Sequence, residues 1–282
     1  MRIDLHTHST ASDGTQSPAE VIRSASEAGL DVVALTDHDS TRGWAAAEEA
    51  ARSLGIAVVP GIEISCAIRN ISVHLLAYLH DPSDAALLSE SEHARASRTT
   101  RARRMVELLA QDYPITWADV QAQVVDDTTL GRPHIADALV ARGIVRDRNE
   151  AFVDLLHSRG AYHVPHYAPD PVTAVRLVRA AGGVPILAHP FAEQRGRVVD
   201  DADIEAMIQA GLAGLEVDHR DHDPAARRHA ADLAQAWGVL ATGSSDYHGA
   251  GKDNRLGENL TEPVVLEQIE DQATGPITVI RS

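Results

Sequence analysis

The segment Asp31-Val-Val-Ala-Leu-Thr-Asp-His-Asp39 decides the fold predicted for this chain. Residues 31–36 form a nearly continuous apolar run, which is typical of a strand buried on both faces of a parallel sheet. The run ends in Asp37-His38-Asp39, so polar side chains collect where the strand stops. A helical pattern follows from about residue 41 to residue 54, and Gly55 ends it. This segment therefore predicts a strand–helix unit whose polar end can carry chemistry.

The same alternation of strand and helix extends outward over most of the chain. Strands are predicted at residues 2–6, 56–64, 71–79, 184–188, 212–217 and 239–242. Alternation of this kind indicates an α/β fold, and apolar strands favour a parallel sheet closed into a barrel. Residues 89–166 instead show only helical patterns, including one long helix over residues 87–111. We therefore predict a barrel from residues 1–88 and 167–282, with a helical insertion at 89–166 that covers the mouth of the barrel.

Composition limits the classes of function open to the chain. The 282 residues include 25 basic and 41 acidic side chains, which give a formal net charge of −16. Proteins that track a long nucleic-acid backbone normally carry a basic surface, so we expect a small or short anionic substrate rather than a long polymer such as duplex nucleic acid. The single cysteine, Cys66, cannot form an intrachain disulfide and fits a reducing compartment. With neither a signal-peptide pattern nor an apolar run of membrane-spanning length, we expect a cytoplasmic protein that does not enter membranes.

Nine histidine and acidic residues recur at the predicted strand ends and in the loops beside them. His6 and His8 are two residues apart in extended backbone, so both imidazoles point the same way and can reach one ion. The full set comprises His6, His8, Asp13, His38, Glu63, His74, His189, Asp246 and His248. Six imidazoles and three carboxylates suffice for two or three divalent ions, and a set without thiolates suits manganese, zinc or iron.

Several of these residues also have a purely structural explanation. His74 taken alone reads as a histidine satisfied within the core, His189 as a strand cap, and Asp246 as the residue of an Asx turn. The recurrence of nine such residues at strand ends and in loops favours a metal site over these separate explanations.

Five short motifs contain most of the nine residues: Asp4-Leu-His-Thr-His-Ser9, Thr36-Asp-His-Asp39, Pro60-Gly-Ile-Glu63, Ala188-His-Pro190 and Ser245-Asp-Tyr-His-Gly249. Together they resemble the polymerase and histidinol phosphatase (PHP) family of metal-dependent phosphoesterases, which is part of the amidohydrolase superfamily. The resemblance implies a distorted (β/α)7 barrel with three divalent ions, for which we expect manganese, with zinc or iron as alternatives. It implies one ion held by His6, His8, Glu63 and Asp246, a second shared by Glu63, His74 and His189, and a third held by Asp13, His38 and His248. Catalysis is accordingly expected of Glu63, Asp246 and His248.

Three further segments lie in the predicted insertion: Arg101-Ala-Arg-Arg-Met105, Gly131-Arg-Pro-His-Ile-Ala136 and Gly160-Ala-Tyr-His-Val-Pro165. They resemble the PHP subgroup of nucleoside 3′,5′-bisphosphate phosphatases and related 5′→3′ exonucleases. That resemblance implies that a substrate phosphate is bound by Arg101, Arg104, Arg132 and His134. From the residues alone, Arg101 and Arg104 share one helix face, whereas Arg95, Arg98 and Arg103 read as a solvated face. The remaining histidines, among them His219 and His222, read as surface or helix residues.

The function implied by the resemblance is hydrolysis of the 3′-phosphate of a nucleoside 3′,5′-bisphosphate, such as pAp to AMP and phosphate. The same site could instead act as a 5′→3′ exonuclease on short 5′-phosphorylated oligonucleotides. Histidinol phosphatase activity is a weaker alternative, because it gives the arginines of the insertion no task. A non-catalytic metal-binding module that supports a polymerase is a further alternative, and the complete ligand set weighs against it. The sequence does not indicate an oligomeric state.

Overall fold

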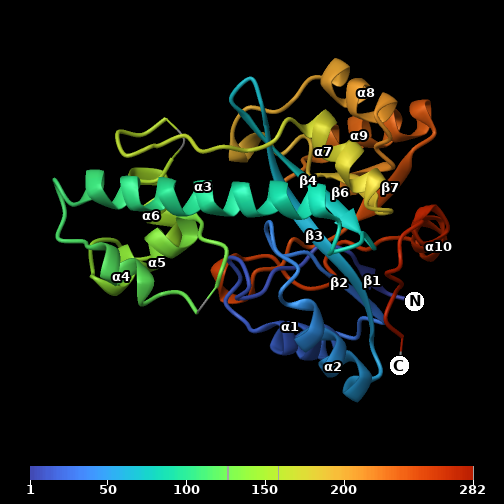
Figure 1. Ribbon diagram of the computed structural model, residues 1–282, viewed down its shortest axis with the longest axis horizontal. Helices are drawn as coiled ribbons and strands as arrows, with labels where there is room; N and C mark the ends of the chain where they lie inside the picture. Colours follow the sequence, from blue (N-terminus) through green and yellow to red (C-terminus); the bar gives the residue numbers. More distant parts are fainter. Residues whose placement is uncertain (126, 158, 282) are drawn as a thin grey trace.

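Seven strands form the centre of the protein in the computed structural model, which describes residues 1–125, 127–157 and 159–281. The strands hydrogen-bond to one another in chain order, and a bridge between Thr7 and Tyr247 joins the two edges into a nearly closed barrel (Figure 1). They are β1 (Ile3–Asp4), β2 (Val32–Leu35), β3 (Ala57–Ile68), β4 (Ile71–Tyr78), β5 (Val184–Ala188), β6 (Gly214–Asp218) and β7 (Leu240–Gly243). The predicted α/β barrel is confirmed.

Strand β4 departs from the parallel sheet that the sequence predicts. It runs antiparallel to both β3 and β5. Only Arg69 and Asn70 connect it to β3, with φ angles of 48° and 63°, as in a two-residue hairpin turn of type I′. A parallel connection needs a crossover of a dozen or more residues, so this short loop permits only an antiparallel pair. The hairpin places His74 opposite Ala188 at the end of β5, beside the predicted ligand His189.

Six helices of the described chain cover the outside of the barrel. They are α1 (Pro18–Glu27), α2 (Trp44–Leu54), α7 (Pro171–Ala180), α8 (Asp201–Gln209), α9 (Pro224–Trp237) and α10 (Pro263–Gln272), with 3₁₀ turns at Glu193–Arg195 and Gly249–Gly251. Figure 1 shows α1 and α2 on one side of the strands and α7, α8 and α9 on the opposite side. Helix α1 begins with a capping box formed by Ser17 and Glu20. Helix α10 begins without a side-chain cap but with Pro263 in its first turn.

Apolar side chains bury both faces of the sheet. Leu75 and Leu187 pack with residues of α7, α8 and α9, while the adjacent Leu76 and Ile186 pack with residues of β1, β2, β3 and α10. All four side chains are fully buried, and burial of one such side chain stabilises the fold by about 1.5–3 kcal/mol. The core therefore fixes the strand ends to which most of the predicted ligands belong.

Helices α3 (Ala85–Leu109), α4 (Trp117–Gln121), α5 (Arg132–Ala141) and α6 (Arg148–Asp154) lie between β4 and β5 in the sequence. Figure 1 shows α3 extending from the barrel across the molecule, with α4, α5 and α6 beside its C-terminal half. These helices share a hydrophobic core that includes Met105, Leu109, Ile135 and Leu156. Because α3 begins at Ala85, one continuous helix belongs to both the barrel and the helical part. The domain division at residues 89 and 166 stays a prediction.

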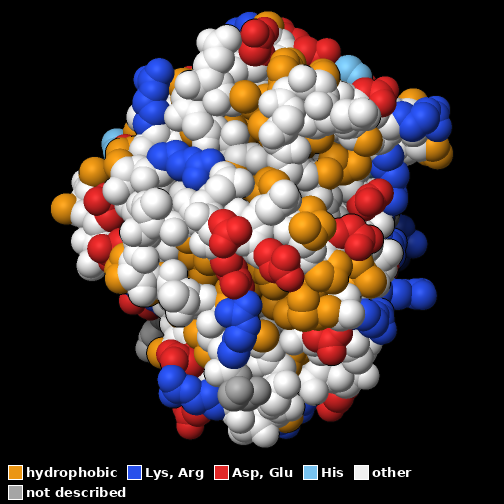
Figure 2. All heavy atoms as spheres, turned by 90° about the vertical axis from the view of Figure 1, so that its right-hand side faces the viewer, with side chains coloured by type: hydrophobic (Ala, Val, Ile, Leu, Met, Phe, Trp, Pro, Cys, Tyr) orange, Lys and Arg blue, Asp and Glu red, His pale blue; other side chains and the backbone are white. Residues whose placement is uncertain are grey.

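The surface carries charges of both signs. Figure 2 views the molecule from the right-hand side of Figure 1, on which α10 lies, and shows acidic and basic side chains interspersed with apolar ones. Such a mixture is typical of an ordinary solvated surface. In the part of the chain that the structure describes, no helix is both long and apolar enough to cross a membrane.

Candidate metal centre

The nine predicted ligands lie together at one end of the barrel. His6 and His8 follow β1, His38 follows β2, His189 follows β5, and Asp246 follows β7. Because parallel strands end at the same edge of a barrel, residues far apart in the sequence meet there. Eight of the nine side chains are buried, and only His74 is partly exposed. The ligand side chains therefore lie largely inside the end of the barrel, with His74 at their exposed edge.

Glu63 on β3 is the centre of the cluster. Its Oε1 lies 2.8 Å from His74 Nδ1 and 3.3 Å from His189 Nε2. Its Oε2 lies 3.0 Å from His8 Nε2 and 3.2 Å from His38 Nδ1. Each carboxylate oxygen thus has its own set of imidazoles, which is the arrangement expected of a ligand that bridges two ions.

Two other carboxylates complete the cluster. Asp246 Oδ1 lies 3.5 Å from His6 Nε2 and 3.4 Å from His8 Nε2. Asp13 Oδ1 lies 3.2 Å from His248 Nε2. The rings of His8 and His248 stack with their centroids 4.1 Å apart, so the groups around the two aspartates are adjacent.

The contacts between imidazoles and carboxylates are close, but several are not hydrogen bonds. His38 Nδ1, His74 Nδ1 and His248 Nε2 have no hydrogen-bond partner among the described residues, although a carboxylate oxygen lies within 3.2 Å of each. Their lone pairs are therefore not directed at the carboxylates, as expected of atoms that face a common ion.

The spacing of the donor atoms also fits divalent metal ions. Within each of three groups these atoms lie within 4.8 Å of one another: His8, Asp13, His38 and His248; His6, His8, Glu63 and Asp246; His38, Glu63 and His74. Nitrogen and oxygen ligands lie about 2.0–2.2 Å from an ion such as zinc, so donors that share one ion must be this close. Imidazole and carboxylate donors without thiolates also suit manganese, zinc or iron.

The contacts within the cluster shift its acid–base properties. Burial alone would raise the pKa of Glu63, but the surrounding imidazoles, His38 foremost, hold that pKa well below its usual range. Burial would likewise lower the pKa of His8, but hydrogen bonds to Asp246 and Glu63 raise it to about 9. Glu63 is therefore anionic at neutral pH, and His8 releases a proton when it binds a metal ion.

Glu216 on β6 is absent from the predicted site but orients two of its members. Its carboxylate is fully buried; Oε1 lies 3.1 Å from His6 Nδ1, and Oε2 accepts a 2.7 Å hydrogen bond from the backbone N–H of His189. A carboxylate on one ring nitrogen of a histidine fixes the tautomer that leaves the other nitrogen for an ion. An acidic residue inside the apolar strand at residues 212–217 is the signal that could have identified it.

Two cations hold Asp246 in place. Arg195 Nη2 and Lys252 Nζ donate to its Oδ2 at 2.6 Å and 2.9 Å, whereas Oδ1 faces the imidazoles. Burial alone would raise the pKa of Asp246, but Lys252 and Arg195 hold it well below its usual range. Neither cation lies in a predicted motif or on a periodic element, so the sequence offers little signal for either.

The prediction that His219 and His222 are surface or helix residues is wrong. Both side chains are buried. His222 Nε2 accepts a 3.1 Å hydrogen bond from the backbone N–H of Phe191. The His219 ring lies 5.2 Å from the His189 ring, and its Nε2 is 3.6 Å from Asp246 Oδ2. The loop after β6 therefore packs against the ligands. The residues around these two histidines are polar, so the sequence looks like an exposed loop and gives no sign of this tertiary contact.

Three residues of the site have unusual backbone conformations. Asp39, His189 and Asp246 have φ angles of 50°, 30° and 53°, which residues other than glycine rarely adopt. Each such residue costs about 1–3 kcal/mol and persists only where its surroundings fix it. Asp39 is fixed by hydrogen bonds from the Ser65 backbone N–H and from Arg98.

An arginine cluster from the helical part lies beside the metal centre. We define it as Arg98, Arg101 and Arg132, which surround His166. Arg101 is 7% exposed, and its Nη1 lies 3.2 Å from His166 Nδ1. Burial, followed by the three guanidinium groups, lowers the pKa of His166 to about 3, and His74 of the metal centre contributes to the same shift. The His166 imidazole is therefore neutral, and it lies within electrostatic range of both groups.

Arg104 and Arg98 differ in their placement from the predictions, whereas the predicted role of His134 stays a prediction. Arg104 is 62% exposed and donates to Glu107 at 2.7 Å, so the structure does not bring it to the metal centre. His134 is buried, and its Nδ1 accepts a 3.0 Å hydrogen bond from the N-cap backbone N–H of α5. The prediction that Arg98 is solvated is wrong, because α3 packs this side chain onto the barrel, where it pairs with Asp39 at 2.8 Å.

Comparison with known proteins places the chain in a family. Residues 4–128 match the family model described as the PHP domain. A 3′,5′-nucleoside bisphosphate phosphatase from Chromobacterium violaceum is 33% identical over 260 residues, which cover 90% of this chain and 89% of that protein. The chain belongs to the PHP family.

Two further relatives of this PHP chain describe its class of chemistry. A 5′-3′ exoribonuclease from Haemophilus influenzae is 31% identical over 261 residues, which cover 92% of this chain and 94% of that protein. The solved structure of a protein described as a metal-dependent phosphoesterase, from Bifidobacterium adolescentis, superposes with a TM-score of 0.95 at 42% identity over 97% of both chains. The PHP chain is accordingly a metal-dependent phosphoesterase, and its predicted hydrolase class is confirmed.

Proposed function

We propose that this phosphoesterase removes the 3′-phosphate of nucleoside 3′,5′-bisphosphates, as in the conversion of pAp to AMP and phosphate. The observation that carries the proposal is a pair of guanidinium groups without counter-charge beside the metal centre. Neither Arg101 nor Arg132 forms an ion pair with a described residue: Arg101 contacts His166, and Arg132 donates to the Leu156 carbonyl at 3.0 Å. Arg101 Nε has no hydrogen-bond partner in the described part of the chain.

These arginines suit a phosphate group. Burial, and then Arg98 and Arg132, lower the pKa of Arg101 well below its usual range, which reflects like charges held close together. A phosphate offers several acceptor oxygens, and a guanidinium group can donate two parallel hydrogen bonds to it. A substrate with one phosphate at the metal centre and another at the arginines therefore satisfies both groups.

We further propose that the nine ligands hold three divalent ions, with manganese favoured and zinc or iron as alternatives. Bound ions would supply charge neutralisation on the phosphoryl oxygens and an activated water. The protein's own residues position that chemistry. Glu63 joins the two imidazole sets, Arg195 and Lys252 keep Asp246 ionised with Oδ1 turned inward, and His248 faces Asp13.

The non-reacting phosphate supplies binding energy that positions the reacting one. In this proposal the 5′-phosphate binds Arg101, Arg132 and His134, and the 3′-phosphate lies over the ligand cluster. Fixing both ends of a small substrate raises the rate of the chemical step as well as the affinity. We leave Arg104 out of this set because its side chain pairs with Glu107 in solvent.

A second candidate is 5′→3′ cleavage of short 5′-phosphorylated oligonucleotides. The relative from Haemophilus influenzae is named as a 5′-3′ exoribonuclease, and hydrolysis of a phosphodiester needs the same groups. The net charge of −16 disfavours long polymers but not short fragments. For both candidates we propose a cytoplasmic enzyme with small soluble nucleotides as its partners.

Steady-state kinetics on the manganese-loaded protein test the first candidate. The kcat/KM for pAp should exceed that for adenosine 3′-monophosphate by about ten- to hundredfold per phosphate-binding arginine. Arg132→Ala should lower kcat/KM for pAp by a factor of this size. It should change kcat/KM for the 3′-monophosphate little and leave the metal content intact. Arg146→Ala is the matched control, because this arginine of the helical part pairs with Glu150 in solvent.

Two outcomes would contradict the assignment. Equal losses on both substrates would show that Arg132 supports structure or chemistry rather than recognition of the second phosphate. Faster turnover of a 5′-phosphorylated oligonucleotide than of pAp by the wild-type protein would favour the second candidate.

A further inference from the structure

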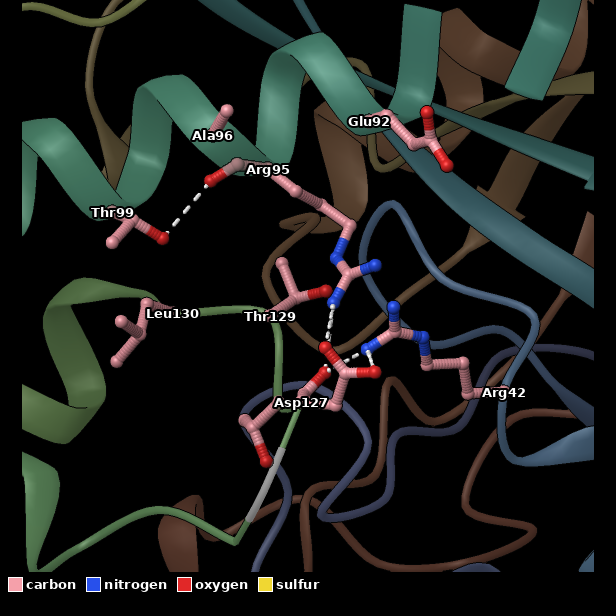
Figure 3. Close-up of a pocket in the computed structure, with 9 residues that line it drawn as sticks. Arg42, Glu92, Arg95, Ala96, Thr99, Asp127, Thr129 and Leu130 are labelled. Atoms are coloured by element: carbon pink, nitrogen blue, oxygen red, sulfur yellow. Dashed lines mark hydrogen bonds and ion pairs between the residues drawn. The ribbon is translucent and has the colours of Figure 1, made fainter. Parts of the chain in front are cut away.

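A pocket of about 290 Å³ opens between α3, residues 127–130 and the loop after β2 (Figure 3). We call it the side pocket, and its lining includes Arg42, Arg95, Asp127, Thr129 and Leu130. Figure 3 shows Arg42 and Arg95, which come from different elements, both directed toward Asp127. Neither arginine belongs to the metal centre or to the arginine cluster.

One exposed residue neutralises both cations. Arg42 Nη1 donates to the Asp127 carbonyl at 2.7 Å and pairs with its carboxylate. Arg95 Nη2 donates to the same carbonyl at 2.8 Å and lies 3.5 Å from Asp127 Oδ1. The Asp127 side chain is 67% exposed, and its φ of 70° is unusual for a residue other than glycine. Ion pairs of exposed carboxylates are weak, so an anionic ligand can replace this one.

The side pocket also holds buried donors without partners. Thr129 is 2% exposed, and neither its Oγ1 nor Arg95 Nε has a hydrogen-bond partner among the described residues. Figure 3 shows the Thr129 hydroxyl directed toward the Arg95 guanidinium, with Glu92 on the far side of Arg95 from Asp127. Burial and the neighbouring Arg42 lower the pKa of Arg95, so an anion between the two arginines would relieve their repulsion. Such a set of donors suits a phosphate.

The wall of the side pocket is attached to a loop of the metal centre. Thr128 Oγ1 donates to the Thr10 carbonyl at 2.9 Å, and the Thr129 backbone N–H donates to the Ala11 carbonyl at 3.0 Å. Ala11 precedes the predicted ligand Asp13 by two residues. The pocket therefore lies against the loop that carries this ligand.

The side pocket and the arginine cluster lie at different points along α3. Arg95 precedes Arg101 by six residues, which is about 9 Å along a helix axis. Between them Arg98 binds Asp39, the residue directly after His38 of the metal centre. A substrate that extends from the arginine cluster past the metal centre can therefore reach the side pocket.

We propose that the side pocket binds a backbone phosphate of a short oligonucleotide, and that this phosphate displaces the Asp127 carboxylate. The inference rests on the proposed function, in which the 5′-phosphate lies at the arginine cluster and the next phosphate at the metal centre. The following phosphate, between the second and third nucleotides, then meets Arg42, Arg95 and Thr129. The substrate class thus includes 5′-phosphorylated oligonucleotides of three or more nucleotides in addition to the bisphosphate.

Binding of a 5′-phosphorylated tri-adenylate to the manganese-loaded protein tests this proposal. The first linkage is a methylene phosphonate, which keeps the charge and resists hydrolysis, and a 3′-fluorophore reports binding by anisotropy. Arg42→Ala and Arg95→Ala should each weaken binding by about five- to tenfold. Asp127→Ala should strengthen binding by about two- to fivefold, because it removes the competing anion. Arg52→Ala on α2, which removes an exposed arginine that pairs with Glu48, should change binding by less than about twofold.

A second probe identifies the phosphate involved. It carries an uncharged methylphosphonate at the second linkage, and the wild-type protein should bind it about five- to tenfold more weakly than the charged probe. Arg42→Ala keeps Arg95 but lacks one of the two arginine contacts, so it should discriminate less between the two probes than the wild-type protein does. The expected gain in Asp127→Ala also guards against misfolding as an explanation, since a misfolded variant would lose affinity.

The outcomes separate this inference from the function on which it rests. Equal binding of both probes by the wild-type protein, or equal discrimination by wild type and Arg42→Ala, would overturn the side-pocket assignment. Weaker binding by Asp127→Ala would overturn it as well, because Asp127 would then belong to the binding surface. A wild-type protein that discriminates the probes as expected but leaves pAp intact would refute the bisphosphatase activity and support the pocket.

Discussion

The metal centre and the arginine cluster lie beside each other but balance charge in opposite ways. In the metal centre each of Glu63, Asp13 and Asp246 has an imidazole nitrogen within 3.4 Å. In the arginine cluster only Arg98 pairs with a carboxylate among the described residues. The first group thus combines anionic and imidazole donors for cations, whereas the second keeps positive charge that a substrate anion can neutralise.

The two regions are also held by different parts of the fold. The ligands stand on or just after barrel strands, whereas Arg101 and Arg132 stand on α3 and α5, which pack in a core of their own. Substitutions should therefore separate metal content from substrate selectivity. The following variants test that separation, from the largest expected effect to the smallest.

Glu63→Gln should have the largest effect. The amide is uncharged and turns a donor toward the imidazoles, so the two imidazole sets lose the carboxylate that joins them. We expect the loss of about one to two ions per chain. The kcat should fall by at least about 10³-fold on every phosphoester. Removal of the ions with a chelator should abolish activity in the same way. Elemental analysis and kcat on pAp and adenosine 3′-monophosphate measure this. If the variant kept its full metal content and lost activity on pAp alone, metal content and substrate selectivity would not be separate functions of the two regions.

Arg98→Ala should have the second largest effect, on stability. Arg98 Nε bonds the buried Asp39 carboxylate at 2.8 Å, so removal of the guanidinium leaves a buried charge without its cation. Such a loss costs about 3–5 kcal/mol in the free energy of unfolding. Urea unfolding of the metal-loaded protein measures this loss of stability. Arg98→Lys, which keeps a cation, should recover part of the lost free energy of unfolding. Wild-type stability together with a lost preference for pAp would assign Arg98 to substrate binding.

Glu216→Gln should have a smaller effect, limited to the metal affinity of the metal centre. Its carboxylate contacts His6 Nδ1 and holds the His189 backbone without ligating an ion in this interpretation. Loss of such a supporting carboxylate typically weakens metal affinity about 10–100-fold. Competition with a chelator measures the affinity, and the preference for pAp at saturating manganese should persist. Unchanged affinity would mean that the core alone orients His6.

The sequence predicts the ligand cluster well because its information is local. His6, His38 and His189 each stand at or near the end of an apolar strand, and a barrel brings such ends together. The strand alternation likewise predicts the barrel. It does not predict the reversed β4, because a two-residue hairpin loop is a weaker signal than the alternation around it.

What the sequence does not predict depends on tertiary packing. Helix periodicity indicates which residues of α3 share a face, but not which face the barrel buries. The helix pattern therefore predicts Arg98 in solvent and Arg104 at the site, whereas the structure buries Arg98 and exposes Arg104. Glu216, Arg195 and Lys252 act through ligands that are distant in the chain, so no spacing rule connects them to the site.

Arg104→Ala should have the smallest effect, and its comparison with Arg101→Ala is the sharpest test of the two regions. The two arginines carry the same charge three residues apart on α3, but Arg101 is 7% exposed whereas the Arg104 side chain is 62% exposed. The solvent pair of Arg104 with Glu107 contributes at most about 0.5 kcal/mol. We therefore expect kcat/KM on pAp within about twofold of wild type for Arg104→Ala, and a loss of about ten- to hundredfold for Arg101→Ala.

The salt dependence of this pair decides what a larger Arg104 effect would mean. An exposed charge acts on a substrate through a field that is screened beyond about 10 Å at 0.1 M ionic strength, whereas a buried contact is screened much less. A loss in Arg104→Ala that disappears at high salt would reflect long-range attraction of the substrate. A salt-resistant loss as large as that of Arg101→Ala would show that both arginines contact the bound nucleotide. The uncompensated charge of the arginine cluster would then extend to a residue that the free protein exposes to solvent.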